Sequence, residues 1–353
     1  MRQALYVAAL AIALGCGTAK EAALTPPGPL TLMSVNIASG AGDRFRTADH
    51  RVGQGAFVAR SSAEVVGLQE VDVGVDRSGD ADTAARVAAA ASPGFATCAF
   101  AVVDPPHLRG DGTRLARCEA GAIVFGVGFR GDDPFAADDR GTPSGIMDGD
   151  DSLNPTGVDR GADALYGNAL IVAAPWEVEA TYTVALPMDA SGPRAPDTLL
   201  DRLARESPDV DAIAALAAHN DATRRRRGIE PRSALVARIR KPGTTALSVI
   251  TTHLESAGPS ELRGAQLDAL VAIARVEQQR NDHRVVVLGD FNMPSSEARP
   301  ALAAAGFVLA APTEAAADID QIWVDATLVI DAATRAPTDG ASDHAYAPIA
   351  TVR

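Results

Sequence analysis

Short apolar runs alternate with amphipathic stretches along most of the chain, a pattern typical of strands interspersed with helices. Strands are predicted over residues 30–37, 65–69, 121–126, 169–173, 178–185, 234–240, 246–253, 285–290, 321–324 and 347–352. Helices are predicted over residues 46–60, 80–91, 260–280 and 296–304. In the third helix Leu262, Leu270 and Ile273 recur at helical spacing, as expected of a helix that covers a sheet. The order of elements predicts a layered α/β sandwich over residues 30–353.

Two long segments interrupt this pattern. Residues 130–163 are rich in Gly and Asp and are interpreted as a surface loop. Calcium binding is the alternative there, although EF-hand spacing is absent. Residues 189–231 form a second insertion that contains the arginine run Arg224–Arg227. This run is either a solvated surface or a clamp on a phosphate-rich substrate.

The N-terminal residues read as a targeting sequence. Arg2 precedes the apolar stretch Leu5–Leu14, whose length of about ten residues is too short to span a bilayer of roughly 30 Å. The stretch runs into Ala13-Leu14-Gly15-Cys16, which resembles a bacterial lipoprotein signal with Cys16 as the lipidated residue. We therefore expect a signal peptide over residues 1–16 and a linker over residues 17–29.

Such a signal implies an outer-membrane or cell-surface lipoprotein that touches the membrane only through its lipid anchor. An ordinary cleaved signal, giving a periplasmic or secreted protein, is the alternative. With Cys16 lipidated, Cys98 and Cys118 remain, and they form either a disulfide in an oxidising exterior or two buried thiols.

Composition narrows the choice of partners. The 353 residues are 47% hydrophobic, which is enough for a sizeable core, and the formal net charge is −13. This acidity disfavours non-specific binding to nucleic acid or anionic lipid, unless a bound metal reverses the local sign. Four histidines are interpreted as surface or structural residues and both tryptophans as core residues: His50, His107, His219, His283, Trp176 and Trp323.

In five places, polar or ionisable residues stand at the ends of the predicted strands, where α/β proteins tend to place their sites. They are Asn36, Glu70, His253, Asp290 with Asn292, and Asp320 with Asp343 and His344. Glu70, Asp343 and the amide oxygen of Asn36 are hard oxygen ligands of the kind that Mg²⁺ prefers. No HExxH or CxxC pattern indicates a zinc site.

The order of seven short motifs resembles the endonuclease/exonuclease/phosphatase (DNase I-like) superfamily. They are Asn36, Leu68-Gln69-Glu70, Tyr166-Gly167-Asn168-Ala169-Leu170, Thr252-His253-Leu254, Gly289-Asp290-Phe291-Asn292, Ile319-Asp320-Gln321-Ile322 and Ser342-Asp343-His344. The resemblance covers residues 30–353 and implies a four-layer α/β sandwich, with two central mixed β-sheets flanked by helices. It also implies Mg²⁺-dependent hydrolysis of a phosphodiester or phosphomonoester, with Mn²⁺ or Ca²⁺ as alternative metals and no obligate protein partner.

The resemblance also implies a role for each motif. Glu70 is expected to be the main metal ligand, with Asn36 and Asp343 nearby. His344 is expected to act as general base or to stabilise the pentavalent transition state, and Asp320 to hydrogen-bond one of its ring nitrogens.

Asp290 and Asn292 are expected to position the attacking water and bind phosphate, or to help hold a second metal. His253 is expected to contact the phosphate or assist the leaving oxygen, and Asn168 to support the site or touch substrate. Since abasic-site endonucleases generally lack this histidine, the strand end at His253 looks more like the sphingomyelinase, DNase I-like and phosphatase branches.

The substrate stays open between nucleic acid, phospholipid and small phosphoester. Two readings of other classes stand beside the hydrolase. One is a catalytically inactive surface binding protein on the same fold, and the other is a calcium-dependent adhesive lipoprotein that uses the Asp-rich loop. EDTA-sensitive hydrolysis separates the first from the enzyme, and calcium stabilisation that survives Glu70→Ala would indicate the second.

Overall fold

The computed structural model describes residues 25–38, 48–75, 81–96, 98–103, 113–130, 165–188, 232–256, 259–280, 284–311 and 318–353. The predicted signal peptide, Cys16, most of the linker and the arginine run Arg224–Arg227 lie outside the described residues. So do the insertion at 189–231 and all of the insertion at 130–163 except Arg130. The expectations for these segments therefore stay predictions.

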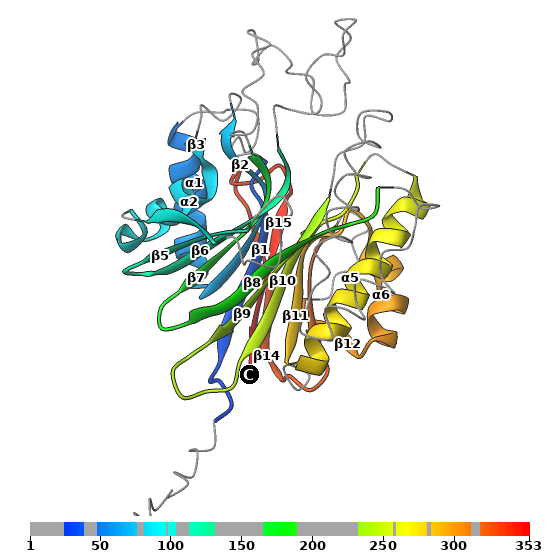
Figure 1. Ribbon diagram of the computed structural model, residues 1–353. Coiled ribbons are helices and arrows are strands. Elements are labelled where there is room, and N and C mark those ends of the chain that lie inside the picture. The colour runs from blue at the N-terminus through cyan, green and yellow to red at the C-terminus, as the bar shows by residue number, and fades with distance from the viewer. Residues whose placement is uncertain are drawn as a thin grey trace, which may run out of the picture.

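Two mixed sheets form the centre of the described domain (Figure 1). In spatial order, the first holds β14 (Ile330–Pro337), β15 (Tyr346–Val352), β1 (Leu30–Asn36), β2 (Val65–Val75), β7 (Leu165–Ala173), β6 (Gly121–Arg130), β5 (Thr113–Cys118) and β4 (Ala99–Val103), with β3 (Ala81–Asp82) paired to β2. The second holds β12 (Phe307–Leu309), β13 (Asp320–Asp325), β11 (Val285–Asp290), β10 (Leu247–His253), β9 (Ser233–Arg240) and β8 (Glu177–Ala185). Pairs β1–β2 and β10–β11 are parallel, and the other pairs are antiparallel.

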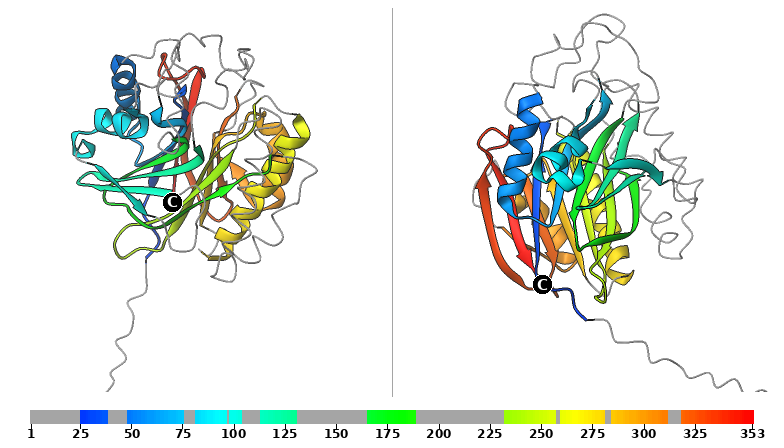
Figure 2. Two further views of the ribbon diagram at one scale, coloured as in Figure 1. Left: turned by 45° about the horizontal axis from the view of Figure 1, so that its top comes forward. Right: turned by 90° about the vertical axis from the view of Figure 1, so that its left-hand side faces the viewer.

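Helices cover the outer face of each sheet (Figure 2). The helices are α1 (Ala48–Ser61), α2 (Thr83–Ala91), α5 (Ser260–Arg280) and α6 (Ser295–Ala304), with a short 3₁₀ turn at Pro93–Phe95. Helices α1 and α2 pack on the first sheet, and α5 and α6 pack on the second. These four layers confirm the predicted four-layer α/β sandwich with two mixed sheets flanked by helices.

The core has three parts because the central strands bury both faces. In β1, Leu30 and Leu32 face the second sheet, while Met33 and Val35 face α1 and α2. In β11, Val286 and Leu288 lie between the sheets, while Val285 and Val287 face α5 and α6. Strands buried on both faces read as continuous apolar runs, which explains why the sequence pattern located them. Trp176 and Trp323 are buried in this core, as predicted.

The ten predicted strands and four predicted helices are all present, with ends shifted by a few residues. Five further strands were not predicted: β3, β4, β5, β12 and β14. Strand β14 lies at a sheet edge and is mostly exposed, and β12 and β3 have three and two residues, so none carries a long apolar run.

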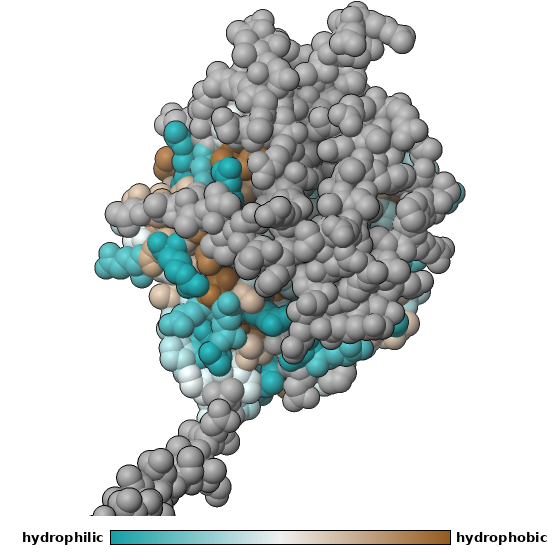
Figure 3. All heavy atoms as spheres, in the orientation of Figure 1, coloured by the Kyte–Doolittle hydropathy of each residue, from teal (hydrophilic) through white to brown (hydrophobic). Residues whose placement is uncertain are grey.

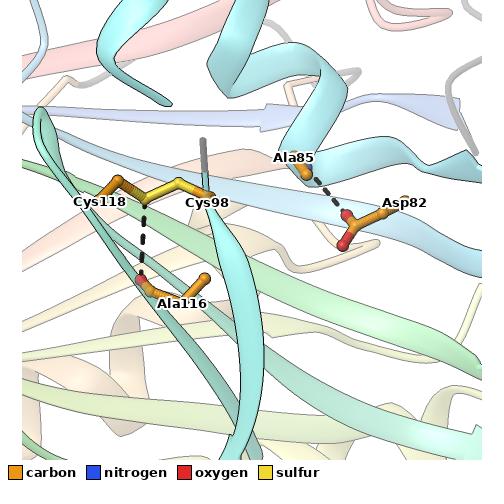
Figure 4. The surroundings of a disulfide bond; sticks show 5 residues. All are labelled: Asp82, Ala85, Cys98, Ala116 and Cys118. Atoms are coloured by element: carbon orange, nitrogen blue, oxygen red, sulfur yellow. Dashed lines mark hydrogen bonds between the residues drawn. A yellow bond between two sulfur atoms is a disulfide. The ribbon is translucent and has the colours of Figure 1, made fainter. Parts of the chain in front are cut away.

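Cys98 and Cys118 form a disulfide, which decides between the two alternatives left open by the sequence (Figure 4). The bond joins residues at the ends of the paired strands β4 and β5. Nearby, Asp82 caps α2 by accepting a hydrogen bond from the backbone N–H of Ala85 at 2.9 Å.

The outer surface carries no large apolar area among the residues that the structure describes. Its exposed large apolar side chains are Val52, Val308, Val329 and Tyr346, and they come from separate elements. Where the face in Figure 3 is coloured, hydrophilic residues lie among smaller apolar areas. Within the described ranges, none of the helices has the length and apolar character needed to cross a membrane.

Candidate active site

Strand register brings three of the predicted residues side by side in the second sheet. His253 ends β10 and is paired with Asp290, which ends the parallel strand β11. Asp290 is in turn paired with Asp320, the first residue of antiparallel β13. Residues in register point to the same face of a sheet. His253, Asp290 and Asp320 therefore form a row at one edge, on the face that packs against the first sheet.

A glycine allows this row to be tight. Gly289 has φ +150°, and a Cβ built there would lie 2.0 Å from the carbonyl oxygen of Thr252 on the neighbouring strand. Only glycine accepts this approach without a backbone shift.

Asn36 faces this row from the first sheet. It follows Leu30, Leu32 and Ser34 in the alternation of β1, so its side chain points between the sheets. Its Nδ2 donates to Oδ2 of Asp290 at 3.2 Å and to Oε1 of Glu70 at 2.9 Å. The Asn36 amide thus connects the two carboxylates.

Glu70 reaches the site through a β-bulge. Between Leu68 and Val71, Gln69 and Glu70 together oppose one residue of β7, and Glu70 has φ +56°. Regular alternation would send Glu70 outward with Leu68, toward the helices. A bulge re-aims a side chain, and bulges are common next to active sites. Here the bulge brings the Glu70 carboxylate to Asn36.

His344 and Asp320 form the shortest contact of the site. Nδ1 of His344 lies 2.6 Å from Oδ2 of Asp320, which is the hydrogen bond that the motif comparison predicted. The short turn before β15 presents this ring, because the Ser342 hydroxyl accepts from the His344 backbone N–H at 3.0 Å. The His344 side chain is 20% exposed, whereas that of Asp320 is 2% exposed. The imidazole ring is therefore hydrogen-bonded to a buried carboxylate and is itself partly exposed to solvent.

Asp290 is the centre of the constellation. Beyond its bond from Asn36, its Oδ2 lies 3.4 Å from Nε2 of His253 and 3.7 Å from Nε2 of His344. Its Oδ1 accepts the backbone N–H of Asn292 at 2.8 Å. The Asp290 side chain is 1% exposed, so these contacts lie in a region of low dielectric.

The remaining predicted residues occupy the margins of the site. Asn292 has φ +48° and donates from Nδ2 to the carbonyl of Leu254. Asn168 is buried and donates to the carbonyl of Ser233, so it ties β7 to β9 across the two sheets. Asp343 is 53% exposed and lies with Oδ1 4.0 Å from Nε2 of His344.

Arg232 is a site residue that the sequence reading missed. It immediately precedes β9, is 2% exposed, and places Nη1 2.9 Å from Nδ1 of His253. The sequence favours the run Arg224–Arg227 as a basic group near the substrate, because a single arginine before a strand carries no signal. The only cue was its place beside a strand that neighbours the one ending in His253.

The pKa values of two carboxyl groups in the site, Glu70 and Asp290, are raised. Burial, followed by the charge of Asp343, raises the pKa of Glu70 to about 7, against the opposing effects of Asn36 and Arg232. Burial, followed by the charge of Asp320, raises the pKa of Asp290 to about 6. These two carboxyl groups hold protons more tightly than ordinary surface groups do.

The two histidines are shifted in opposite directions. Burial lowers the pKa of His253 well below its usual range, and the charges of Arg232 and His344 add to this effect. Burial also acts to lower the pKa of His344, but the hydrogen bond and charge of Asp320 outweigh it, and the pKa rises to about 10. His253 is therefore neutral and His344 cationic at neutral pH in the protein without a metal.

The site can accept a divalent cation. Asp290, Asp320 and His344 offer ligand atoms within 4.8 Å of one another. Oδ1 of Asp320 is buried and has no hydrogen-bond partner within the described part of the chain. After burial, the charge of a neighbouring carboxylate is the next cause that raises the pKa of Glu70 and of Asp290, and a cation would offset that charge. This group shares no residue with the predicted ligands Asn36, Glu70 and Asp343, and Asp290 joins the two sets through Asn36.

The family of the chain follows from comparison with known proteins. The Endonuclease/Exonuclease/phosphatase family matches residues 33–344, so the chain belongs to this family of phosphate-ester hydrolases. Among curated proteins, no sequence matches significantly.

Solved structures share the fold. An endonuclease/exonuclease/phosphatase from Beutenbergia cavernae has a TM-score of 0.54 at 17% identity, covering 92% of this chain and 71% of its own. The human Nocturnin catalytic domain, solved with bound sulfate, has a TM-score of 0.52 at 13% identity. The match covers 94% of this chain and 95% of that domain. A mannosyl-6-phosphatase from Bacteroides thetaiotaomicron has a TM-score of 0.50 at 13% identity. The match covers 92% of this chain and 99% of that protein. At such identities the similarity concerns the fold.

Proposed function

We propose that the chain is an exported, Mg²⁺-dependent phosphoesterase that hydrolyses a phosphodiester or phosphomonoester. The observation that carries the proposal is the pairing of His344 with buried Asp320 at 2.6 Å, beside Asp290 and across from the Glu70–Asn36 pair. A histidine oriented by a carboxylate next to a candidate cation site is suited to water activation and phosphoryl-group stabilisation.

Glu70, Asn36 and Asp343 are the proposed metal ligands. Glu70 and Asp343 are close enough for the charge of Asp343 to raise the pKa of Glu70. Asn36 now points its Nδ2 at the carboxylates and its Oδ1 at the backbone N–H of Ala38, so its amide would have to turn to offer oxygen. A bound divalent cation would polarise the phosphoryl oxygens and offset the charge that develops there.

The remaining side chains divide the work of hydrolysis. Asp320 fixes Nδ1 of His344 as the protonated nitrogen, which leaves Nε2 on the side of Asp290. His344 then either takes the proton of the attacking water or, as an imidazolium, stabilises the pentavalent transition state. Asp290 and Asn292 position water and phosphate, and Asn168 supports the site between the sheets.

Export is proposed from the signal-like N-terminus, and the Cys98–Cys118 disulfide supports an oxidising location. Thr25, the first described residue, contacts the turn between β9 and β10 at Gly243 and Thr244. That turn lies at the opposite end of β10 from His253. A lipid anchor at Cys16 would thus be attached to the end of the domain remote from the site, which favours a substrate outside the anchoring membrane.

Hydrolysis tests the proposed activity. Purified full chain is assayed with Mg²⁺, Mn²⁺ or Ca²⁺ against plasmid DNA, RNA, sphingomyelin, inositol phosphates and bis-p-nitrophenyl phosphate. EDTA-sensitive hydrolysis of at least one ester is expected. Absence of hydrolysis across the panel, with retained metal binding, would instead support an inactive binding protein on this fold.

The decisive variant is His344→Ala. Loss of the base or transition-state contact should lower kcat by about 10²–10⁴-fold. Tyr346→Ala, at an exposed position two residues along, is the matched control and should keep the parent rate. Near-normal activity of His344→Ala would contradict the assignment.

A further inference from the structure

His253 has an arginine, not a carboxylate, as the partner of its inner ring nitrogen. Arg232 places Nη1 2.9 Å from Nδ1 of His253, and both side chains are almost fully buried. The guanidinium is held from other sides as well. Its Nη2 donates to the Ser256 hydroxyl at 3.4 Å, and its Nε lies 3.8 Å from Oε2 of Glu255.

This contact fixes the tautomer of His253. A guanidinium group carries only donors and keeps its protons in proteins, so it cannot accept a hydrogen bond. Nδ1 of His253 must therefore be the acceptor, and the ring proton must be on Nε2. Nε2 is the nitrogen that faces Oδ2 of Asp290, at 3.4 Å. The ring thus presents an N–H, and no lone pair, to the site.

We propose that Arg232 is a positioning residue that holds His253 as a fixed Nε2–H hydrogen-bond donor. The catalytic part of this inference rests on the proposed phosphoesterase function, whereas the tautomer does not. In catalysis, His253 donates a hydrogen bond to a phosphoryl or leaving-group oxygen and keeps its proton. His344 differs, because its Nδ1 bonds to the Asp320 carboxylate. The two histidines differ in role because their partners differ in charge.

The tautomer can be read directly by NMR. Long-range ¹H–¹⁵N correlation spectra of the full chain, labelled at histidine, distinguish a protonated ring nitrogen from one with a lone pair. The His253 signals are assigned by their loss in His253→Ala. Protonated Nε2 and unprotonated Nδ1 are expected for His253, and protonated Nδ1 for His344. A proton on Nδ1 of His253 would overturn the proposal whether or not the protein hydrolyses any ester.

Kinetics test whether Arg232 acts through His253. Arg232→Met should lower kcat by roughly 10- to 100-fold, as loss of a group that orients a functional histidine typically does, with little change in KM. Arg232→Lys, which keeps a cationic donor, should recover part of the loss. In a His253→Ala background, Arg232→Met should have no further effect on kcat, because the partner is already gone. An equal fall in kcat in both backgrounds would show a merely structural role and refute the inference.

Arg238 provides the matched control. It lies on β9, the strand that Arg232 immediately precedes, and its guanidinium pairs with buried Glu277 at 3.0 Å, on the opposite face from the site. Arg238→Met should lower the melting temperature and leave kcat and the His253 tautomer unchanged. A kcat loss in Arg238→Met as large as that in Arg232→Met would also refute the role. If the parent chain hydrolyses nothing, the proposed function fails while the NMR result still decides the tautomer.

Discussion

Glu70 and Asp290 hold protons because folding buries them among other negative groups. Their pKa values rise to about 7 and about 6, in each case first through burial. A carboxyl group with a raised pKa binds more protons folded than unfolded, so its contribution to stability falls as pH rises from the unfolded to the folded value. The protein without metal should therefore lose stability between roughly pH 4 and pH 7.

Metal binding should show the opposite dependence on pH. At pH 8 both carboxylates are ionised and available to a cation, whereas at pH 5 protons compete with it. A Mg²⁺ concentration of 100 times the dissociation constant measured at pH 8 should stabilise the fold by about 2.7 kcal/mol at that pH. The same Mg²⁺ concentration should stabilise it much less at pH 5. Thermal unfolding at the two pH values, with and without Mg²⁺, measures the difference.

Glu70→Gln is the control for that measurement. It keeps the shape of the side chain and removes the charge, so the Mg²⁺-dependent shift in melting temperature should nearly disappear. An equal shift in the parent and in Glu70→Gln would place the cation elsewhere.

His344 gives a second dependence on pH, at higher values. Its pKa is raised to about 10, chiefly because the bond and charge of Asp320 overcome burial. The stability from this ion pair is fully present below roughly pH 6.5 and is lost as pH rises toward 10. In Asp320→Asn, NMR titration should show the pKa of His344 moving down toward its ordinary value. An unchanged titration would mean that other groups hold the proton.

At the scale of the elements, two backbone features bring the site together: the bulge in β2 and the close approach at Gly289. The strands that end in Asn36, His253 and Asp290 were predictable, because their apolar runs stop where polar residues begin. The bulge was not predictable, because it depends on how β2 pairs with β7, where Gln69 and Glu70 lie opposite a single residue. Sequence spacing alone would point Glu70 toward α1 and α2.

Gly289→Ala tests the importance of the close approach between β10 and β11. The added methyl group meets the carbonyl oxygen of Thr252, so the strands must separate at His253 and Asp290. We expect a loss of roughly 1–3 kcal/mol in unfolding free energy, together with a fall in activity. Chemical denaturation measures the first quantity.

Gly264→Ala is the matched substitution. Gly264 lies in α5, and a Cβ there has nothing within 4 Å among the described residues. Replacing it should stabilise the protein by about 0.5–1 kcal/mol, because alanine has less conformational entropy to lose in a helix. A similar cost at both glycines would mean that the contact with Thr252 is unimportant.

The disulfide is the other feature whose effect lies at this scale. Cys98 and Cys118 are 20 residues apart and join β4 to β5 at the edge of the first sheet. Closing a loop of this size lowers the conformational entropy of the unfolded chain and stabilises the fold by about 3 kcal/mol. Cys98→Ser should therefore lower the unfolding free energy by a similar amount. Urea denaturation of Cys98→Ser and of the reduced parent should agree. Full stability in both would show that the bond contributes little.

For the whole molecule, the net charge of −13 sets an expectation about nucleic acid. Repulsion between an acidic protein and the phosphate backbone opposes metal-independent capture of DNA. In EDTA at physiological salt, fluorescence anisotropy with labelled duplex DNA should give a dissociation constant above about 10⁻⁴ M, weaker than typical non-specific binding. Tight binding that weakens steeply with salt would show that the arginine run at 224–227 outweighs the net charge.

The four-layer architecture follows from the sequence because the central strands bury both faces and leave continuous apolar runs. Among the strands that were missed, β14 is a mostly exposed edge strand, and β12 and β3 have only three and two residues, so their apolar patterns are weak. The sequence also supplied nearly all residues of the candidate site, since functional side chains stand at strand ends. It could not supply Arg232, whose importance comes from lying against His253 rather than from its neighbours in the chain.

The sequence by itself determined the layers and the family resemblance, and it named Asn36, Glu70, His253, Asp290 and His344 as candidate site residues. These are set by local periodicity and by side-chain chemistry, both of which are written along the chain. Only the tertiary structure decided that Glu70 turns inward, that Asn36 connects two carboxylates, and that the two histidines have partners of opposite charge. Those features depend on contacts between segments up to 254 residues apart, which no local pattern encodes.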